Sequence, residues 1–180
     1  MQGSLTKKQA VDRELLKGCS AVAALLLLVV QFAAIRLADT DLTVRILVPL
    51  TIACAPIVLW IYRDRLGVVV MFVGLATNLS VILANGGLMP VERPVLARAI
   101  NSDYALNYEA GAWAPQTKNV VVEEGEGNLT ALRDQIVIKL IRGGVIASPG
   151  DIVVLSGLLL LVTEEVWRGK KREKRRGKSK

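Results

Sequence analysis

Residues 66–88 have the sequence LGVVVMFVGLATNLSVILANGGL and contain no Asp, Glu, Lys or Arg. A helix needs about 20 predominantly apolar residues to cross the ~30 Å hydrocarbon core of a bilayer. Two further stretches, 18–35 and 46–62, also lack these charged residues, and a fourth apolar stretch, 152–163, is shorter. We therefore predict an all-α membrane protein with four transmembrane helices and an irregular extracytoplasmic segment between the third and the fourth.

Composition supports this class and limits the chemistry. Hydrophobic residues make up 52% of the 180-residue chain, which is high for a soluble domain. The chain has no His, which excludes His-dependent catalytic triads, His metal sites and His proton switches. Cys19 and Cys54 lie inside apolar stretches, so we interpret them as buried thiols rather than as a disulfide or a metal pair. We predict no metal site and no cofactor.

The distribution of positive charge predicts the orientation, because Lys and Arg concentrate on the cytoplasmic side of membrane proteins. With four spans, 15 of the 23 cations fall on one side: four before the first stretch, two between the second and third, and nine in the tail RGKKREKRRGKSK (168–180). We therefore expect both termini in the cytoplasm. The tail is also expected to attract anionic lipid, at about 1 kcal/mol per cation. We predict no nucleic-acid partner, because the basic cluster abuts a membrane segment.

These features divide the chain into five parts. They are a cytoplasmic amphipathic arm (1–17), three transmembrane helices (18–88), an extracytoplasmic lid packed on the helices (89–149), a fourth transmembrane helix (150–167) and the basic cytoplasmic tail (168–180). Within the lid, the run Val120-Val121-Val122 predicts a short strand.

The first of two motifs that flank the lid is Asn85-Gly86-Gly87-Leu88-Met89-Pro90, at the outer end of the third predicted helix. Glycine tolerates the left-handed conformation that follows the last turn of a helix, and proline forbids continuation of the helix. The motif therefore predicts a helix stop. A backbone loop that binds a ligand at the membrane surface is the alternative, so the candidate functional residues here are Asn85, Gly86, Gly87, Met89 and Pro90.

The second motif, Ser148-Pro149-Gly150-Asp151, opens the fourth predicted helix. Ser148 suits the N-cap and Pro149 the first helical position. Asp151 suits the third position, where its carboxylate can accept a hydrogen bond from the cap N–H and complement the helix dipole. The alternative is that Asp151 binds a cation or acts in acid–base chemistry at the outer surface. Ser148, Gly150 and Asp151 are therefore candidate functional residues.

Asp134 is a second acid expected near the same membrane surface. Two neighbouring carboxylates can form an aspartyl dyad, in which each raises the pKa of the other and one proton is shared. Lipoprotein signal peptidases, which also have four spans, use two Asp residues of this kind. Asp134 directly follows Arg133, however, and we expect it to be solvated rather than paired.

Three segments resemble a bacterial family of small membrane proteins known only as domain of unknown function 5317. They are ANGGLMPV (84–91), LRDQIVI (132–138) and ASPGDIV (147–153), the last followed by Gly157. The family pattern has an Asn-Gly-Gly-x-Met-Pro turn after a span, a Leu-Gly-Asp-like segment, and then Ser-x-Gly-Asp opening the last span. Where the family tends toward Leu-Gly-Asp, this chain has Leu132-Arg133-Asp134. The resemblance covers roughly residues 20–165 and implies a multi-pass protein of the bacterial plasma or inner membrane, without an assigned activity.

Three functions are compatible with these features. We favour a non-enzymatic interaction or structural component of the cell membrane, which acts through lipid or another membrane protein. A small transporter or channel component would require Gln31, Pro49, Pro56 and Asn78 to face one polar cavity. An intramembrane aspartyl hydrolase would require Asp134 and Asp151 to meet.

Overall fold

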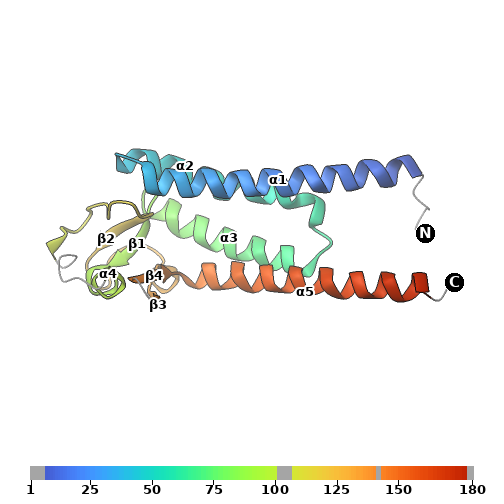
Figure 1. Cartoon of the computed structure of the whole chain (residues 1–180). Coiled ribbons are helices and arrows are strands. Elements are labelled where there is room, and N and C mark those ends of the chain that lie inside the picture. Colours follow the sequence, from blue (N-terminus) through green and yellow to red (C-terminus); the bar gives the residue numbers. More distant parts are fainter. Residues whose placement is uncertain (1–6, 101–106, 141–142, 178–180) are drawn as a thin grey trace.

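The structure, a computed structural model, describes residues 7–100, 107–140 and 143–177, without the side chains of 7–11, 13, 14, 140, 143 and 172–177. Four long helices run along the molecule: α1 (Lys7–Leu37), α2 (Asp41–Leu59), α3 (Leu66–Ala84) and α5 (Pro149–Gly177). The start of α1 and the end of α5 lie at one end, and the lid lies at the other (Figure 1). The chain is therefore an elongated helical body with a small cap.

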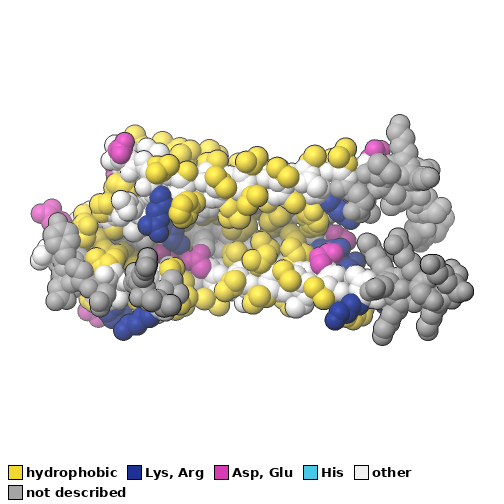
Figure 2. Space-filling view, in the orientation of Figure 1, with side chains coloured by type: hydrophobic (Ala, Val, Ile, Leu, Met, Phe, Trp, Pro, Cys, Tyr) yellow, Lys and Arg dark blue, Asp and Glu magenta, His cyan; other side chains and the backbone are white. Residues whose placement is uncertain are grey.

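Three of these helical segments are long and apolar enough to cross a membrane, namely Leu15–Leu37, Asp41–Tyr62 and Leu66–Ala84. The second includes η1 (Trp60–Tyr62), a short 3-10 helix that follows α2. Most side chains on the outside of the long helices are hydrophobic, and they form an apolar belt between charged groups at its two ends (Figure 2). Apolar surface on this scale is unfavourable in water and favourable in lipid. The three helices therefore indicate a membrane location.

Helices α3 and α5 pack closely through glycine. A Cβ atom added at Gly67 would lie 2.4 Å from the backbone nitrogen of Leu161, and one added at Gly157 would lie 2.6 Å from the Gly67 carbonyl oxygen. Nearer the lid, a Cβ atom at Gly74 would lie 2.7 Å from the Gly150 carbonyl oxygen. Only residues without a side chain let two backbones approach this closely. Helix α5 therefore follows α3 from the lid to the beginning of α3.

The lid contains regular structure, which corrects the prediction of an irregular segment in an all-α chain. Its elements are β1 (Met89–Glu92), α4 (Arg93–Ile100), β2 (Asn119–Val122), η3 (Thr130–Leu132), β3 (Ile136–Leu140) and β4 (Gly143–Ala147). Strands β1 and β2 pair in parallel, whereas β3 and β4 pair antiparallel. The strand predicted at 120–122 is confirmed within β2. Val and Ile recur along the four strands, and their branched side chains suit an extended backbone.

Two buried apolar clusters position the lid. The first joins the lid to the ends of α2 and α3, and it contains Val44, Val48, Ile52, Val81, Ile82, Leu88, Met89 and Val120. The second lies within the lid and contains Val91, Val95, Leu96, Ala114 and Val121. Because the first cluster is continuous between the two parts, the lid is packed on the helices, as the sequence predicted.

The helices extend beyond two predicted boundaries. Over its described residues, the arm expected at 1–17 continues without a break into the first membrane helix, because α1 begins at Lys7. Likewise, α5 continues from the predicted span into the basic tail as far as Gly177. Cys19 is exposed on α1 rather than buried within the protein, and Cys54 is half-buried; both are free thiols.

Candidate functional site

The first motif ends α3 through its two glycines. Gly86 and Gly87 have φ angles of +70° and +90°, in the left-handed region that glycine adopts without strain. The Gly87 N–H donates to the Ile82 carbonyl oxygen at 2.8 Å, which caps the last turn of the helix. The predicted helix stop is confirmed, and Met89 and Pro90 lie beyond it in β1.

Asn85 links this helix end to the lid. Its Nδ2 donates to the Asn128 carbonyl oxygen at 3.0 Å, and its Oδ1 accepts from the Asn128 N–H at 2.8 Å. Asn128 Nδ2 donates in turn to the Ala84 carbonyl oxygen at 2.7 Å. From α2, Arg45 Nη1 donates to the Gly86 carbonyl oxygen at 2.7 Å. The motif therefore joins α2, α3 and a lid loop by satisfying the free backbone groups at a helix end.

Ser148 and Asp151 form the predicted capping box at the start of α5. Ser148 Oγ accepts from the Asp151 N–H, and Asp151 Oδ2 accepts from the Ser148 N–H, both at 3.0 Å. Gly150, between them, lies against α3, where an added Cβ atom would lie 2.0 Å from Asn78 Oδ1. The helix-start interpretation is confirmed, and both capping side chains also have partners outside α5.

Those partners belong to a group of polar residues where the lid meets α3 and α5, which we call the charge cluster. It consists of Asn78 from α3, Lys118 and Asn119 at the start of β2, Asp134 between η3 and β3, and Ser148 and Asp151 at the start of α5. Lys118 Nζ lies 3.1 Å from Asp151 Oδ2 and 3.4 Å from Asp134 Oδ1. One ammonium group therefore links the lid to a long helix.

Amide side chains hold the same two acids from other directions. Asn78 Nδ2 donates to Asp151 Oδ1 at 2.6 Å, while Asn78 Oδ1 accepts from Ser148 Oγ at 2.8 Å. Asn119 Nδ2 donates to Asp134 Oδ2 at 2.7 Å. Hydrogen bonds to ionised groups are about twice as strong as those between neutral groups. Each carboxylate is therefore fixed by both a cation and an amide.

Burial sets the protonation behaviour of the charge cluster. The Asp134 side chain is fully buried, and burial raises the pKa of Asp134, because the Lys118 ammonium offsets the lost hydration only in part. Burial alone would lower the pKa of Lys118, but attraction to Asp134 and Asp151 outweighs it, so the pKa of Lys118 is raised. When all three groups are ionised they carry one net negative charge. Asp134 is therefore the group whose environment favours uptake of a proton.

The expectation that Asp134 is solvated was wrong, because its side chain is fully buried and contacts Lys118 and Asn119 of the lid. Asp134 and Asp151 do approach the same point, but they meet at the Lys118 ammonium. In an aspartyl dyad two carboxyl groups share a proton and raise each other's pKa. Here a cation contacts both carboxylates.

Sequence reasoning missed Lys118 and Asn119. Thr117-Lys118-Asn119 resembles no motif, and its one signal is position: a cation directly before an apolar strand is drawn toward the interior and needs a partner there. Among the residues suggested for a transport path, Asn78 lies in the contact between α3 and α5. Within the described ranges, no group of three or more His, Cys, Asp or Glu is placed to hold a metal ion.

The sequence model of one family, a family of unknown function designated DUF5317, matches residues 15–163. The chain belongs to DUF5317. The matched region includes α2, α3, the whole lid and both motifs, which confirms the resemblance found in the sequence. No curated protein and no solved structure matches the chain. Membership of DUF5317 assigns no activity.

Proposed function

We propose that this DUF5317 protein is a four-span membrane protein in which α5 is the fourth span. The support is the glycine packing between α3 and α5, which continues along the whole of α3. A helix held against a membrane-crossing neighbour over that length shares its lipid surroundings. The apolar signal of α5 is weaker because its apolar stretch lies between Asp151 and the pair Glu164-Glu165.

Charge pairing at both ends of this stretch supports the same placement. Asp151 contacts Lys118 beside the lid, and Glu165 contacts Arg65 at 2.5 Å at the opposite end. Acidic side chains are costly near hydrocarbon unless they are paired or reach the interface. Pairing of Asp151 and Glu165 therefore lowers the cost of placing α5 beside α3 in the membrane.

We place the lid outside the cytoplasm of a bacterial cell and both termini inside it. The support is the positive-inside rule, because the arm, the turn between α2 and α3 and the tail contain most of the cations and lie at the end away from the lid. In this orientation the tail lies at the cytoplasmic leaflet, where anionic lipid attracts it.

For its role, we propose a non-enzymatic interaction or structural component whose lid is a fixed platform at the outer membrane surface. The observation that carries this proposal is the Lys118 ammonium held between Asp134 and Asp151. Lys118, Asp134 and Asp151 are the ionisable side chains of the charge cluster. They contact one another, and they connect the lid to α5. Buried polar networks whose groups are paired rigidify the structure around them.

Cysteine labelling in intact cells tests the orientation. In a chain with Cys19→Ser and Cys54→Ser, a new cysteine replaces either Glu109 in the lid or Gly169 in the tail. A membrane-impermeant maleimide is expected to label the first from outside and the second only after permeabilisation. Labelling of the Gly169 position in intact cells would show that α5 does not cross, or that the orientation is reversed.

Complementation tests the role in cells that lack the native chain. The Asp134→Asn variant retains the shape of the neutral acid and its contact with Asn119, so a structural role predicts that it restores growth or envelope integrity like wild type. Lys118→Met, which removes the ion pairs between the lid cation and the two acids, is expected to fail. An aspartyl hydrolase predicts that Asp134→Asn fails although its lid remains folded, and that result would refute the non-enzymatic role.

A further inference from the structure

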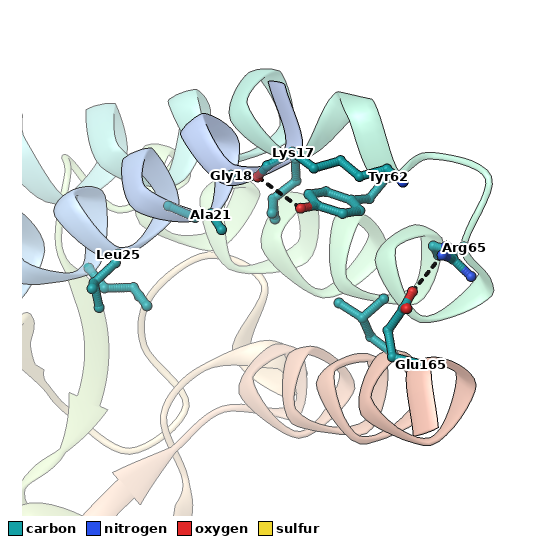
Figure 3. Close-up of a pocket in the computed structure, with 11 residues that line it drawn as sticks. Lys17, Gly18, Ala21, Leu25, Tyr62, Arg65 and Glu165 are labelled. Carbon is teal, nitrogen blue, oxygen red and sulfur yellow. Dashed lines mark hydrogen bonds and ion pairs between the residues drawn. The ribbon is translucent and has the colours of Figure 1, made fainter. Parts of the chain in front are cut away.

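A crevice opens in the helical body at the end opposite the lid (Figure 3). It has a volume of about 730 Å³, which is within the ~300–1,000 Å³ range of small-molecule sites. It lies between α1 on one side and the middle of α5 on the other, beside η1 and the start of α3. Helix α1 packs on α2, whereas α5 packs on α3, so the crevice occupies the space between the two helix pairs.

The lining of the crevice is amphipathic. Apolar wall residues come mainly from α1, namely Ala21, Ala24, Leu25 and Leu28, with Leu161 opposite on α5. The polar lining residues lie together at the end of the crevice away from the lid (Figure 3). They are Lys17, Tyr62, Arg65 and Glu165. Tyr62 Oη donates to the Lys17 carbonyl oxygen at 2.9 Å, which fixes the ring at the edge of the crevice.

Arg65 is the group that indicates a ligand. Arg65 is only 7% exposed, and its Nη2 lies 2.5 Å from Glu165 Oε1. Its Nη1 is also buried and has no hydrogen-bond partner among the described residues. A guanidinium remains charged at all physiological pH values, and a buried donor without an acceptor is unfavourable. Arg65 Nη1 therefore lacks a hydrogen-bond acceptor, and an anionic oxygen of a bound ligand would supply one.

We propose that the crevice binds one anionic phospholipid, with its phosphate at Arg65 and Lys17 and one acyl chain along the α1 wall. Arg65 lies at the depth in the membrane where a lipid phosphate is expected. Trp60 and Tyr62 of the neighbouring η1 are residue types that mark the headgroup level, and Arg65 directly precedes the apolar helix α3. A phosphate accepts several hydrogen bonds from a guanidinium. The inference rests on the membrane placement proposed above, and it concerns a site separate from the charge cluster and the tail.

Native mass spectrometry of the full chain in detergent tests the proposal, with phosphatidylglycerol and phosphatidylcholine added as probes at equal concentration. We expect retention of one phosphatidylglycerol per chain and less phosphatidylcholine. One cation at a lipid surface corresponds to about a fivefold change in affinity, so Arg65→Gln should lower phosphatidylglycerol retention about fivefold.

A second pair of variants leaves the charged residues of the crevice in place and tests the effect of its volume. Ala24→Phe fills the crevice and should also reduce retention, whereas Ala23→Phe places the same ring at the adjacent residue, which lines a different surface depression, and should not. Equal retention of the two lipids, or unchanged retention in Ala24→Phe, would overturn the proposal. A second copy of the chain retained in place of lipid would also overturn it. Cysteine labelling of Gly169 gives its own answer on topology, so failure of either proposal is recognised separately.

Discussion

Replacing Lys118 with Met tests whether the charge cluster holds the lid on α5. The substitution removes the ammonium that contacts Asp134 and Asp151 and keeps the length of the apolar stem. Removing one partner of a buried ion pair costs about 3–5 kcal/mol, because the other charge is left without compensation. Asp134 can limit this cost by taking up a proton.

The free-energy cost of protonating Asp134 depends on pH. Protonating a carboxyl group of ordinary pKa, ~3.9, at pH 7 costs about 4 kcal/mol, at 1.36 kcal/mol per pH unit. At pH 5 the same step costs about 1.5 kcal/mol. We therefore expect Lys118→Met to destabilise the lid by about 3–4 kcal/mol at pH 7 and by less than half of that at pH 5. Adding Asp134→Asn to Lys118→Met should recover most of the loss at pH 7.

Trp113 fluorescence provides the assay. Trp113 is half-buried in the lid, and its Nε1 donates to the Thr117 carbonyl oxygen at 2.9 Å, one residue before Lys118. In a Trp60→Phe and Trp167→Phe background, urea titration in detergent then reports lid unfolding alone. Lys139→Met on the exposed part of β3 is the matched control, with an expected change within about 0.5 kcal/mol. Equal effects of the two Met substitutions, or a Lys118→Met loss that does not shrink on acidification, would refute the argument.

Three further predictions concern the helix contact, the buried acid and the helix stop. Gly157→Ala should destabilise the α3–α5 pair by about 1–3 kcal/mol, because its Cβ atom would meet the backbone of α3, while Gly169→Ala has open space and should be neutral; thermal unfolding in detergent followed by circular dichroism compares them. The folded-state pKa of Asp134 is raised, so its contribution to stability is fully present below its unfolded value of 3.8 and is lost as pH rises through the folded value. Wild type should therefore gain lid stability relative to Asp134→Asn as pH falls from neutral toward 4, and parallel pH profiles for the two chains in urea titrations would contradict this. Asn85→Ala removes both side-chain contacts with Asn128 and should increase proteolysis of the lid loop about tenfold, corresponding to about 1.4 kcal/mol, in limited digestion; unchanged digestion would show that the remaining contacts suffice.

The sequence predicted the local chemistry better than the long-range contacts. The stop at Gly86-Gly87 and the capping box of Ser148 and Asp151 depend on neighbouring residues, so their patterns were visible in the chain. The apolar runs similarly marked the helices, because length and hydropathy are local properties. Of the four short strands in the lid, β2 was predicted and the other three were not, since strand pairing depends on residues far apart in the chain.

The charge cluster could not be predicted for the same reason. Asn78 and Asp151 are 73 residues apart, and Lys118 and Asp151 are 33 apart. Asp134 looked solvated because Arg133 precedes it, but successive residues of an extended chain point in opposite directions. In the structure Arg133 contacts Glu92, while the Asp134 side chain is buried and contacts Lys118.

The pairing of α3 with α5 has a consequence for biosynthesis. Helix α3 ends at Ala84 and α5 begins at Pro149, so the whole lid is translated between them. At about 5–20 residues per second, this interval lasts roughly 3–13 s. In the four-span arrangement proposed above, the glycine face of α3 and the amide of Asn78 are without their partner for this interval. In that arrangement, lipid or the insertion machinery has to cover one side of α3 until α5 is made and packs against it.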